Sequence, residues 1–347
     1  MFQTSDIHIE SSGKVITPNE LKNDVPLSDV AASVVHESRN IIKNILKGDD
    51  DRMIGIIGPC SIHDCDAAVD YAERLYEYSK KVSDRLYLVM RVYFEKPRTT
   101  VGWRGLITDP NLDGSYDINA GLKKARSLMT RISEIGLPIG SEVLDPIIPQ
   151  YIADLISWAA IGARTTESQT HRQLASGLSM PVGFKNGTSG DLKLAADAME
   201  STRYQHSFIG IDQNGKTCVL KTKGNPEVHM ILRGGRTNPN YYEEFVEDAE
   251  DLISAVGLEP RIMIDCSHAN SQKDPRKQFR VLRSLMDQRK RGRKSLIGFM
   301  IESNINDGNQ KIPVNKKDLK YGVSITDPCV GWPSTVEMLD YAYAELA

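Results

Sequence analysis

The stretch Leu86-Tyr-Leu-Val-Met-Arg91-Val-Tyr-Phe-Glu-Lys96-Pro-Arg98-Thr99-Thr100 joins a short apolar run to a group of cations. The run at 86–90 is rich in Leu and Val and bounded by charge, which predicts a buried strand. Arg91 then ends the strand, and Lys96 and Arg98 follow on a loop that Pro97 stiffens. Arginine binds carboxylate or phosphate as a fork, and lysine can also move a proton. The stretch therefore predicts an anion receptor at a strand end, although an isolated Lys-Pro-Arg is more often a solvated loop.

Outward from this stretch, short apolar runs alternate with amphipathic segments along the chain. Predicted strands cover 53–58, 86–90, 137–142, 159–163, 181–184, 228–232, 262–264 and 296–301. Predicted helices lie between Ser28 and Gly48 and over 66–82, 119–135, 146–157, 168–178, 190–201, 240–256 and 275–290, and a capping box at Ser334-Thr-Val-Glu337 predicts the start of the last helix. Eight strands with helical crossovers predict an α/β fold, a (β/α)8 TIM barrel over residues 1–347, with its active site at the C-terminal ends of the strands.

Three segments lie outside this alternation. Residues 1–27 are polar and predict an arm, which with the first helix forms an N-terminal regulatory or oligomerisation extension over 1–50. Within 203–223, two strand-like runs flank Asn214-Gly215, which predicts an inserted β-hairpin before the sixth strand. The basic run 289–294 precedes a strand, so we expect it on the face opposite the active site, as a solvated turn.

The composition is that of an ordinary soluble globular protein, with 40% hydrophobic and 26% charged residues. A formal net charge of −3 and a pI near 6.2 argue against nucleic-acid binding. No stretch approaches the length of a membrane span, and the N-terminus lacks a signal-peptide pattern. Five cysteines without a CxxC pair favour a reducing compartment, so the expected location is the cytoplasm.

Six cationic side chains fall at or just after predicted strand ends: Arg91, Lys96, Arg98, Arg164, Lys185 and Arg233. A barrel would bring them to one mouth, where burying them together is costly unless anions fill the space between them. Any one of them alone would more often form a structural ion pair. As a set, they predict a receptor for two phosphates and a carboxylate.

A second group of strand-end residues has the chemistry of metal ligands: Cys60, His268, Glu302 and Asp327. A closed barrel brings the first strand close to the seventh and eighth, so these side chains can meet. A mixed sulfur, nitrogen and oxygen set would suit a divalent ion such as Mn²⁺, Fe²⁺, Co²⁺ or Zn²⁺, acting as a Lewis acid on a carbonyl. Taken singly, each residue has an ordinary interpretation, such as a buried Cys or a turn Asp.

Seven blocks of the chain carry a family resemblance. They are Gly58-Pro-Cys-Ser-Ile-His63, Arg91-Val-Tyr-Phe-Glu-Lys-Pro-Arg-Thr-Thr100, Gly162-Ala-Arg-Thr-Thr-Glu-Ser-Gln169, Gly183-Phe-Lys-Asn-Gly187, Ile231-Leu-Arg-Gly-Gly235, Asp265-Cys-Ser-His-Ala-Asn270 and Ile301-Glu-Ser-Asn304. In this order they resemble the class I, microbial and feedback-regulated 3-deoxy-D-arabino-heptulosonate 7-phosphate (DAHP) synthases, over residues 28–345. The resemblance implies a metal-dependent transferase that condenses phosphoenolpyruvate with erythrose 4-phosphate, the first step of the shikimate pathway to aromatic amino acids.

The resemblance also implies roles for individual residues. Phosphoenolpyruvate would be held by Arg91, Lys96, Arg164, Lys185 and Arg233, and the sugar phosphate by Arg98 and Thr99. The metal ligands would be Cys60, His268, Glu302 and Asp327, the same set that the strand ends suggest. Lys96 would lie beside both substrates, which makes it the candidate for proton delivery to the new alkoxide, and Cys60 and His268 are the other catalytic candidates.

Family members carry an inhibitor cavity for an aromatic amino acid between the hairpin, the arm and the segment 174–179. Its expected walls are Asp6, Ile9, Pro149, Gln150, Leu174, Leu178, Ser179, Phe208, Gly210 and Leu220, although by residue type alone the apolar ones would be ordinary core. Members that respond to phenylalanine tend to carry Ser where this chain has Gly210. Since glycine leaves room for a phenol oxygen, tyrosine is the expected inhibitor.

The resemblance further implies a homodimer or homotetramer.

Three alternatives to this function remain open. The first is a sister enzyme that condenses phosphoenolpyruvate with a five-carbon sugar phosphate, which the Lys96-Pro-Arg-Thr99 block and the hairpin disfavour. The second is a non-catalytic anion-binding barrel, which requires a broken metal set. The third is a nucleic-acid binder that uses the basic run 289–294, which the acidic pI disfavours.

Overall fold

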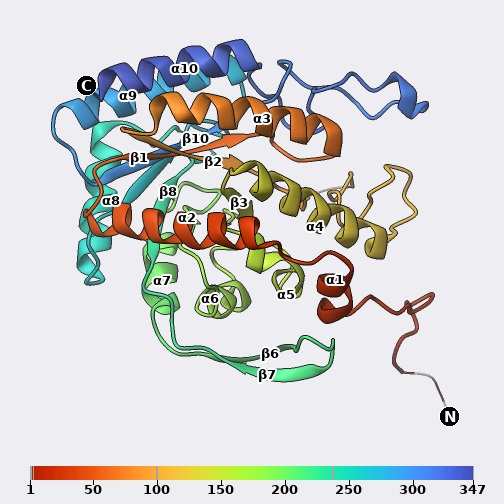
Figure 1. Cartoon of the computed structure of the whole chain (residues 1–347). Coiled ribbons are helices and arrows are strands. Elements are labelled where there is room, and N and C mark those ends of the chain that lie inside the picture. Colours follow the sequence, from red (N-terminus) through yellow and green to blue (C-terminus); the bar gives the residue numbers. More distant parts are fainter. Residues whose placement is uncertain (1, 3, 99–100, 237, 347) are drawn as a thin grey trace.

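The computed structural model, which describes residues 2, 4–98, 101–236 and 238–346, has the predicted closed barrel of eight parallel strands (Figure 1). Successive barrel strands are neighbours, and β10 pairs with β1 to close the barrel. The strands are β1 (Met53–Gly58), β2 (Leu86–Arg91), β3 (Ile139–Glu142), β4 (Trp158–Ile161), β5 (Val182–Lys185), β8 (Val228–Leu232), β9 (Ile262–Asp265) and β10 (Leu296–Glu302). All of the strand ends named in the sequence therefore point to one mouth.

Helices surround the barrel (Figure 1). They are α3 (Cys65–Val82), α4 (Ile118–Ile135), α5 (Pro149–Ile152), α6 (Gln169–Ala175), α7 (Lys193–Thr202), α8 (Glu243–Ala255), α9 (Gln278–Lys290) and α10 (Trp332–Glu345), with the short 3-10 helices η1 (Ala153–Leu155), η2 (Pro275–Lys277) and η3 (Lys316–Asp318). Their buried apolar side chains pack against the outside of the strands and form the larger core cluster. No described helix has the length and apolar character that a membrane crossing requires.

The helices predicted over 168–178, 190–201, 240–256 and 275–290 differ from α6, α7, α8 and α9 by up to three residues at an end, and two other helix predictions are wrong in a larger way. The helix expected over 146–157 is only the four-residue α5 followed by η1, because Ile156 is already extended to enter β4. The last helix begins at Trp332, before the predicted capping box, and Gly331 is its N-cap. Pro333 fits the first helical turn, where its missing N–H costs nothing, so Ser334 lies inside the helix and makes no cap.

The N-terminal arm is more ordered than its sequence suggests. It contains the short helix α1 (Pro18–Asp24), whose capping box pairs Thr17 with Glu20 in both directions. The arm is also tied to the rest of the chain, because the backbone N–H of Asn19 donates to the carbonyl of Gln213 in the hairpin at 2.9 Å.

Helix α2 (Asp29–Lys47) covers the N-terminal end of the barrel. It begins at the Ser28 cap and ends at Gly48, whose φ of +86° suits glycine, and both boundaries match the prediction. Its side chains Ile42, Ile45 and Leu46 join inward-facing strand residues in one buried cluster. The barrel is thus closed by apolar side chains at this end, and its mouth is at the other.

The inserted hairpin forms as predicted, from β6 (Ser207–Ile211) and β7 (Thr217–Lys221) (Figure 1). The two strands pair antiparallel with Gly210 opposite Cys218, and Gly215 in the turn has a φ of +73°. They form a separate sheet, joined to the barrel by contacts with α6 and by the link to the arm.

Candidate active site at the barrel mouth

The C-terminal mouth of the barrel contains a cavity of about 160 Å³ with a strongly cationic lining. Its described lining residues are Arg91, Lys96, Pro97, Arg98, Glu142, Gly162, Ala163, Arg164, Lys185, Thr188, Arg233, His268, Lys273, Thr326 and Asp327. Seven of these are Lys or Arg and only two are acidic. All six cations predicted from the strand ends are among them. Such an imbalance in a partly enclosed space favours an anionic ligand.

The ends of the strands hold the deepest members of the site. Arg91, Lys185 and Glu302 are the last residues of β2, β5 and β10 and are only 1%, 3% and 2% exposed. Arg91 donates to a carboxylate oxygen of Glu302 at 3.0 Å and to the Pro59 carbonyl at 3.1 Å. Its guanidinium also stacks 3.6 Å from the centre of the Tyr93 ring. These contacts fix the Arg91 side chain before any ligand is bound.

Arg233 and Arg164 are less completely paired. Arg233 directly follows β8, and its Nε atom is buried without a hydrogen-bond partner among the described residues. Burial lowers the pKa of Arg233, and nearby Arg164 acts in the same direction, whereas Asp265 opposes them. A buried guanidinium nitrogen without an acceptor is costly, and a bound anion would supply the acceptor.

The outer part of the cavity is formed by the loop after β2. Lys96 donates to the Cys60 carbonyl at 3.1 Å and lies 3.1 Å from the Cys60 sulfur. Arg98 is exposed, and its Nε donates to the Trp103 carbonyl at 2.9 Å. Thr99, the other predicted ligand of the sugar phosphate, lies outside the described residues.

Three of the four predicted metal ligands come together beside this cavity. One ligand atom from each of Cys60, Glu302 and Asp327 lies within 4.8 Å of the others. Burial raises the pKa of the Cys60 thiol, and Glu302 adds to this, while Lys96 and Arg91 oppose it. For the Glu302 carboxyl, burial raises the pKa, but His268, Arg91 and Lys96 outweigh burial and the net shift is downward. The donor set is one sulfur and two carboxylates in a cation-rich pocket.

His268 lies next to this trio without belonging to its tightest part. Its Nε2 is 3.7 Å from a Glu302 carboxylate oxygen. Its backbone has a φ of +54°, a left-handed conformation that is rare outside glycine and that accumulates at functional sites. The predicted role of its imidazole as the nitrogen ligand stays a prediction.

Sequence reasoning missed two carboxylates at the mouth. Glu142 ends β3 and lines the cavity, and no ion pair engages it among the described residues. Asp265 ends β9, is fully buried, and contacts both Lys185 and His268. The signal that identified Arg91 and Glu302, a polar residue at the end of an apolar strand, also applies to these two. Lys273, Thr188 and Thr326 come from loops and carry no such signal.

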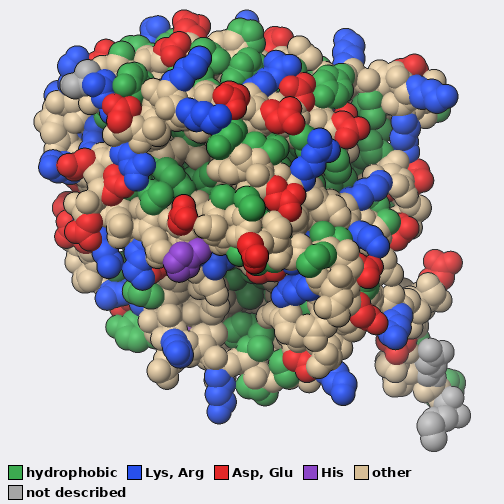
Figure 2. Space-filling view, in the orientation of Figure 1, with side chains coloured by type: hydrophobic (Ala, Val, Ile, Leu, Met, Phe, Trp, Pro, Cys, Tyr) green, Lys and Arg blue, Asp and Glu red, His purple; other side chains and the backbone are tan. Residues whose placement is uncertain are grey.

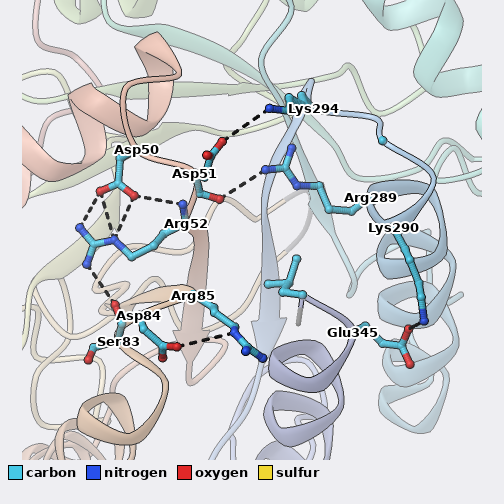
Figure 3. A pocket seen from close by; sticks show the side chains of 12 residues that line it. Asp50, Asp51, Arg52, Ser83, Asp84, Arg85, Arg289, Lys290, Lys294 and Glu345 are labelled. Carbon is cyan, nitrogen blue, oxygen red and sulfur yellow. Dashed lines mark hydrogen bonds and ion pairs between the residues drawn. The ribbon is translucent and has the colours of Figure 1, made fainter.

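A second large pocket, at the opposite end of the barrel, has a different character. It is lined by Asp50, Asp51, Arg52, Ser83, Asp84, Arg85, Arg289, Lys290, Gly292, Lys294, Glu345 and Leu346 (Figure 3). Its charges pair with each other, as in Arg52 with Asp50 at 2.6 Å and Lys290 with Glu345 at 2.8 Å. The basic run is therefore on the face predicted for it. On the face that Figure 2 shows, Lys and Arg are interleaved with Asp and Glu.

Residues predicted for the inhibitor cavity fall into two sets. Phe208 and Leu178 are partly buried against the core, and Gln150 accepts from the hairpin's Gln213 at 3.0 Å. A side chain at Gly210 would point toward Leu220 and Phe208, on the inner face of the hairpin. Asp6 and Ile9 of the arm are exposed, Ile9 by 61%. Their predicted contribution stays a prediction.

Comparison with known proteins places the chain in a family. Residues 22–340 match the DAHP synthetase I family. The Tyr-sensitive phospho-2-dehydro-3-deoxyheptonate aldolase of Salmonella typhimurium is 51% identical over 343 residues, covering 99% of this chain and 96% of that protein. The Phe-sensitive protein of Escherichia coli (strain K12) is 48% identical, covering 97% and 96%. A solved structure of phospho-2-dehydro-3-deoxyheptonate aldolase from Francisella tularensis SCHU S4 has a TM-score of 0.95 at 48% identity, covering 97% of this chain and 98% of that one. The chain therefore belongs to the DAHP synthetase I family.

Proposed function

We propose that this protein condenses phosphoenolpyruvate with erythrose 4-phosphate to give DAHP and inorganic phosphate. The observation that carries the proposal is the cavity with seven cations and two carboxylates at the barrel mouth, in a chain of this family. Two phosphorylated substrates repel each other in water. A pocket of fixed cations offsets that repulsion and holds the reacting carbons together.

The proposed substrate roles combine burial with the family assignment. Arg91 and Lys185 are buried and Arg233 is half-buried, and these three, with the exposed Arg164 that lines the same cavity, would hold the phosphate and carboxylate of phosphoenolpyruvate. The unpartnered Nε of Arg233 supports this, since it has room for an acceptor. Arg98 is on the outer loop and would hold the phosphate of the sugar, together with Thr99, which follows it in the sequence. Lys96 lies between the two regions.

The Cys60, Glu302 and Asp327 cluster, with His268 beside it, suits a divalent ion. A sulfur, two carboxylates and an imidazole favour Mn²⁺, Fe²⁺, Co²⁺ or Zn²⁺ over Mg²⁺ or Ca²⁺, which prefer oxygen alone. When bound there, the ion would polarise the aldehyde oxygen of the sugar as a Lewis acid.

The chain's own residues position the reactants and move protons. C3 of phosphoenolpyruvate forms a bond to the aldehyde carbon, and the carbonyl electrons move onto the aldehyde oxygen. Lys96 delivers a proton to that oxygen; burial lowers its pKa, but the Cys60 sulfur and Glu302 outweigh this and raise it, so the ammonium is the resting form. The π electrons of phosphoenolpyruvate form the new carbon–carbon bond, which leaves C2 electron-poor. Water adds to C2 and loses one proton, which can return to Lys96. The C2–O bond to phosphate then breaks with its electron pair on the phosphate, and the C2 hydroxyl gives its proton to the departing phosphate, which leaves the ketone.

Substrate-dependent phosphate release tests this function. Purified protein with a divalent ion is given phosphoenolpyruvate together with either erythrose 4-phosphate or a five-carbon sugar phosphate. We expect rapid phosphate release from the mixture with erythrose 4-phosphate and none from the mixture with the five-carbon sugar phosphate. Release only with the pentose phosphate would favour the sister enzyme, and no release with either would favour a non-catalytic barrel.

We further propose that an aromatic amino acid, with tyrosine preferred over phenylalanine, inhibits the enzyme at the hairpin. The supporting features are the inner-face position of Gly210 and the link from Gln213 to Gln150.

We also propose a homodimer or homotetramer in which residues 1–50 serve regulation and assembly within one barrel domain. Ile209 and Val219 on the outer face of the hairpin are 78% and 64% exposed, which suits a surface that another subunit covers.

A further inference from the structure

Asp265 holds two parts of the active site at once. Its carboxylate is fully buried, and four donors surround it. The backbone N–H and the hydroxyl of Ser267 donate to Oδ1 at 3.0 and 2.6 Å. Oδ2 accepts from Lys185 Nζ at 3.0 Å and contacts His268 Nδ1 at 2.8 Å. Both oxygens are therefore occupied, and the carboxylate has no freedom to turn.

The contact with His268 decides how that ring is presented. In the neutral ring that a metal ion requires, these contacts favour the tautomer in which Nδ1 carries the proton and donates it to Asp265 Oδ2, at 2.8 Å, and to the Ser267 hydroxyl oxygen, at 2.7 Å. Nε2 is then the proton-free nitrogen, and it faces the Glu302 carboxylate. The left-handed backbone of His268 needs such support, and the Lys273 N–H also holds its carbonyl at 2.7 Å.

The contact with Lys185 decides where that ammonium sits. Lys185 ends β5, lines the anion cavity and is almost fully buried. Asp265 is its only carboxylate partner among the described ion pairs. Because the same Oδ2 atom contacts both Lys185 and His268, removing the charge of Asp265 takes a partner from both groups.

We propose that Asp265 is a positioning residue shared by the metal centre and the phosphoenolpyruvate pocket. It holds His268 with Nε2 free for the ion and Lys185 toward the anionic substrate. This inference rests on the proposed function and adds to it a residue that touches neither substrate nor metal.

The test is Asp265→Asn, which keeps the shape and removes the charge. Mn²⁺ affinity is measured by competition with a chelator, and phosphoenolpyruvate affinity by calorimetry without sugar, so neither depends on turnover. We expect the Mn²⁺ dissociation constant to rise about 10- to 100-fold, as for other partners of metal-bound histidine. The phosphoenolpyruvate dissociation constant and KM should rise about tenfold or more, since a buried cation loses its partner. When Mn²⁺ saturates the variant, KM for erythrose 4-phosphate should stay within about twofold of the wild-type value, because Asp265 does not contact the outer loop.

Asp154→Asn is the matched control. Asp154 is also ion-paired, with the buried Arg126 at 2.7 Å, but it lies outside the mouth cavity. Its loss should lower thermal stability and leave both dissociation constants unchanged. Should Asp265→Asn fail to fold, Ser267→Ala replaces it, and this variant should weaken Mn²⁺ binding while sparing phosphoenolpyruvate.

The proposal is overturned if Asp265→Asn, or Ser267→Ala in its place, lowers only thermal stability and binds Mn²⁺ like wild type. It is equally overturned if Asp265→Asn weakens only one of the two ligands. Failure of the proposed function would look different: wild-type protein would release no phosphate from the substrate pair, whatever the binding constants of the variants.

Discussion

At the scale of single residues, the cations at the barrel mouth differ in how completely they are paired within the protein. Arg91 and Lys185 have carboxylate partners at 3.0 Å, whereas Arg233 has a buried Nε with none among the described residues. Arg98 uses a backbone carbonyl of its own loop. The inner and outer cations are therefore prepared for different ligands.

This difference predicts a split between two alanine variants. Arg233→Ala should mainly raise KM for phosphoenolpyruvate, and Arg98→Ala mainly KM for erythrose 4-phosphate. Removing one partner of a desolvated charge pair typically costs about 2–5 kcal/mol. Steady-state kinetics with each substrate varied in turn measures the split, and equal effects of either change on both substrates would contradict the assignment.

A buried histidine in the barrel core gives a prediction about pH. His229 Nε2 accepts from the Trp158 indole N–H at 2.8 Å, and burial lowers the pKa of His229 to about 4. The unfolded chain has a pKa near 6.5, so between pH 6.5 and 4 it binds a proton that the folded state excludes. The free energy of unfolding should therefore fall as the pH drops through this window, by about 1.4 kcal/mol per pH unit at most.

Denaturant unfolding at pH 7 and pH 5 of wild type and His229→Gln checks this effect. Glutamine can accept from Trp158 but does not titrate. We expect wild type to lose about 1–2 kcal/mol more than the variant between the two pH values. Equal losses of unfolding free energy in the two proteins would mean that His229 does not cause the loss of stability in this pH window.

At the scale of elements, the hydrophobic pattern and the capping residues in the sequence predict most of the barrel. Apolar runs locate every barrel strand to within two residues at each end, and Ser28 and Gly48 mark α2 correctly. The errors occur where a short element depends on its neighbours. The arm shows no apolar period, yet α1 forms because Thr17 and Glu20 cap it and the hairpin contacts it.

The hairpin gives a prediction about inhibitor choice. A Cβ at Gly210 would lie 2.6 Å from Cδ1 of Leu220, so Ser at this position must displace Leu220 and fill space on the inner face. Gly210→Ser should shift inhibition from tyrosine toward phenylalanine, because the phenol oxygen loses its room. Inhibition curves for both amino acids on wild type and variant measure the shift. Wild-type protein inhibited only by phenylalanine, or by neither, would refute this role of Gly210 and leave the catalytic proposal intact.

At the scale of the whole molecule, barrel closure creates the active site. Cys60 and Glu302 are far apart in sequence, and they meet because β1 pairs with β10. Sequence alone could name Arg91, Glu302 and Arg233, since each ends or directly follows an apolar strand, whereas Asp327 lies on the loop between η3 and α10 and carries no such signal. It could not show that Arg91 pairs with Glu302, or that His268 adopts a left-handed backbone, because these depend on three-dimensional packing.

The cation pocket and the metal cluster share one mouth, and metal depletion tests whether they act as one site. After chelation, we expect phosphoenolpyruvate binding to persist, since the cations remain, while condensation with erythrose 4-phosphate stops. Adding Mn²⁺ or Co²⁺ should restore phosphate release in proportion to the metal bound, up to one ion per chain. Full turnover by rigorously metal-free protein would contradict a catalytic role for Cys60, His268, Glu302 and Asp327.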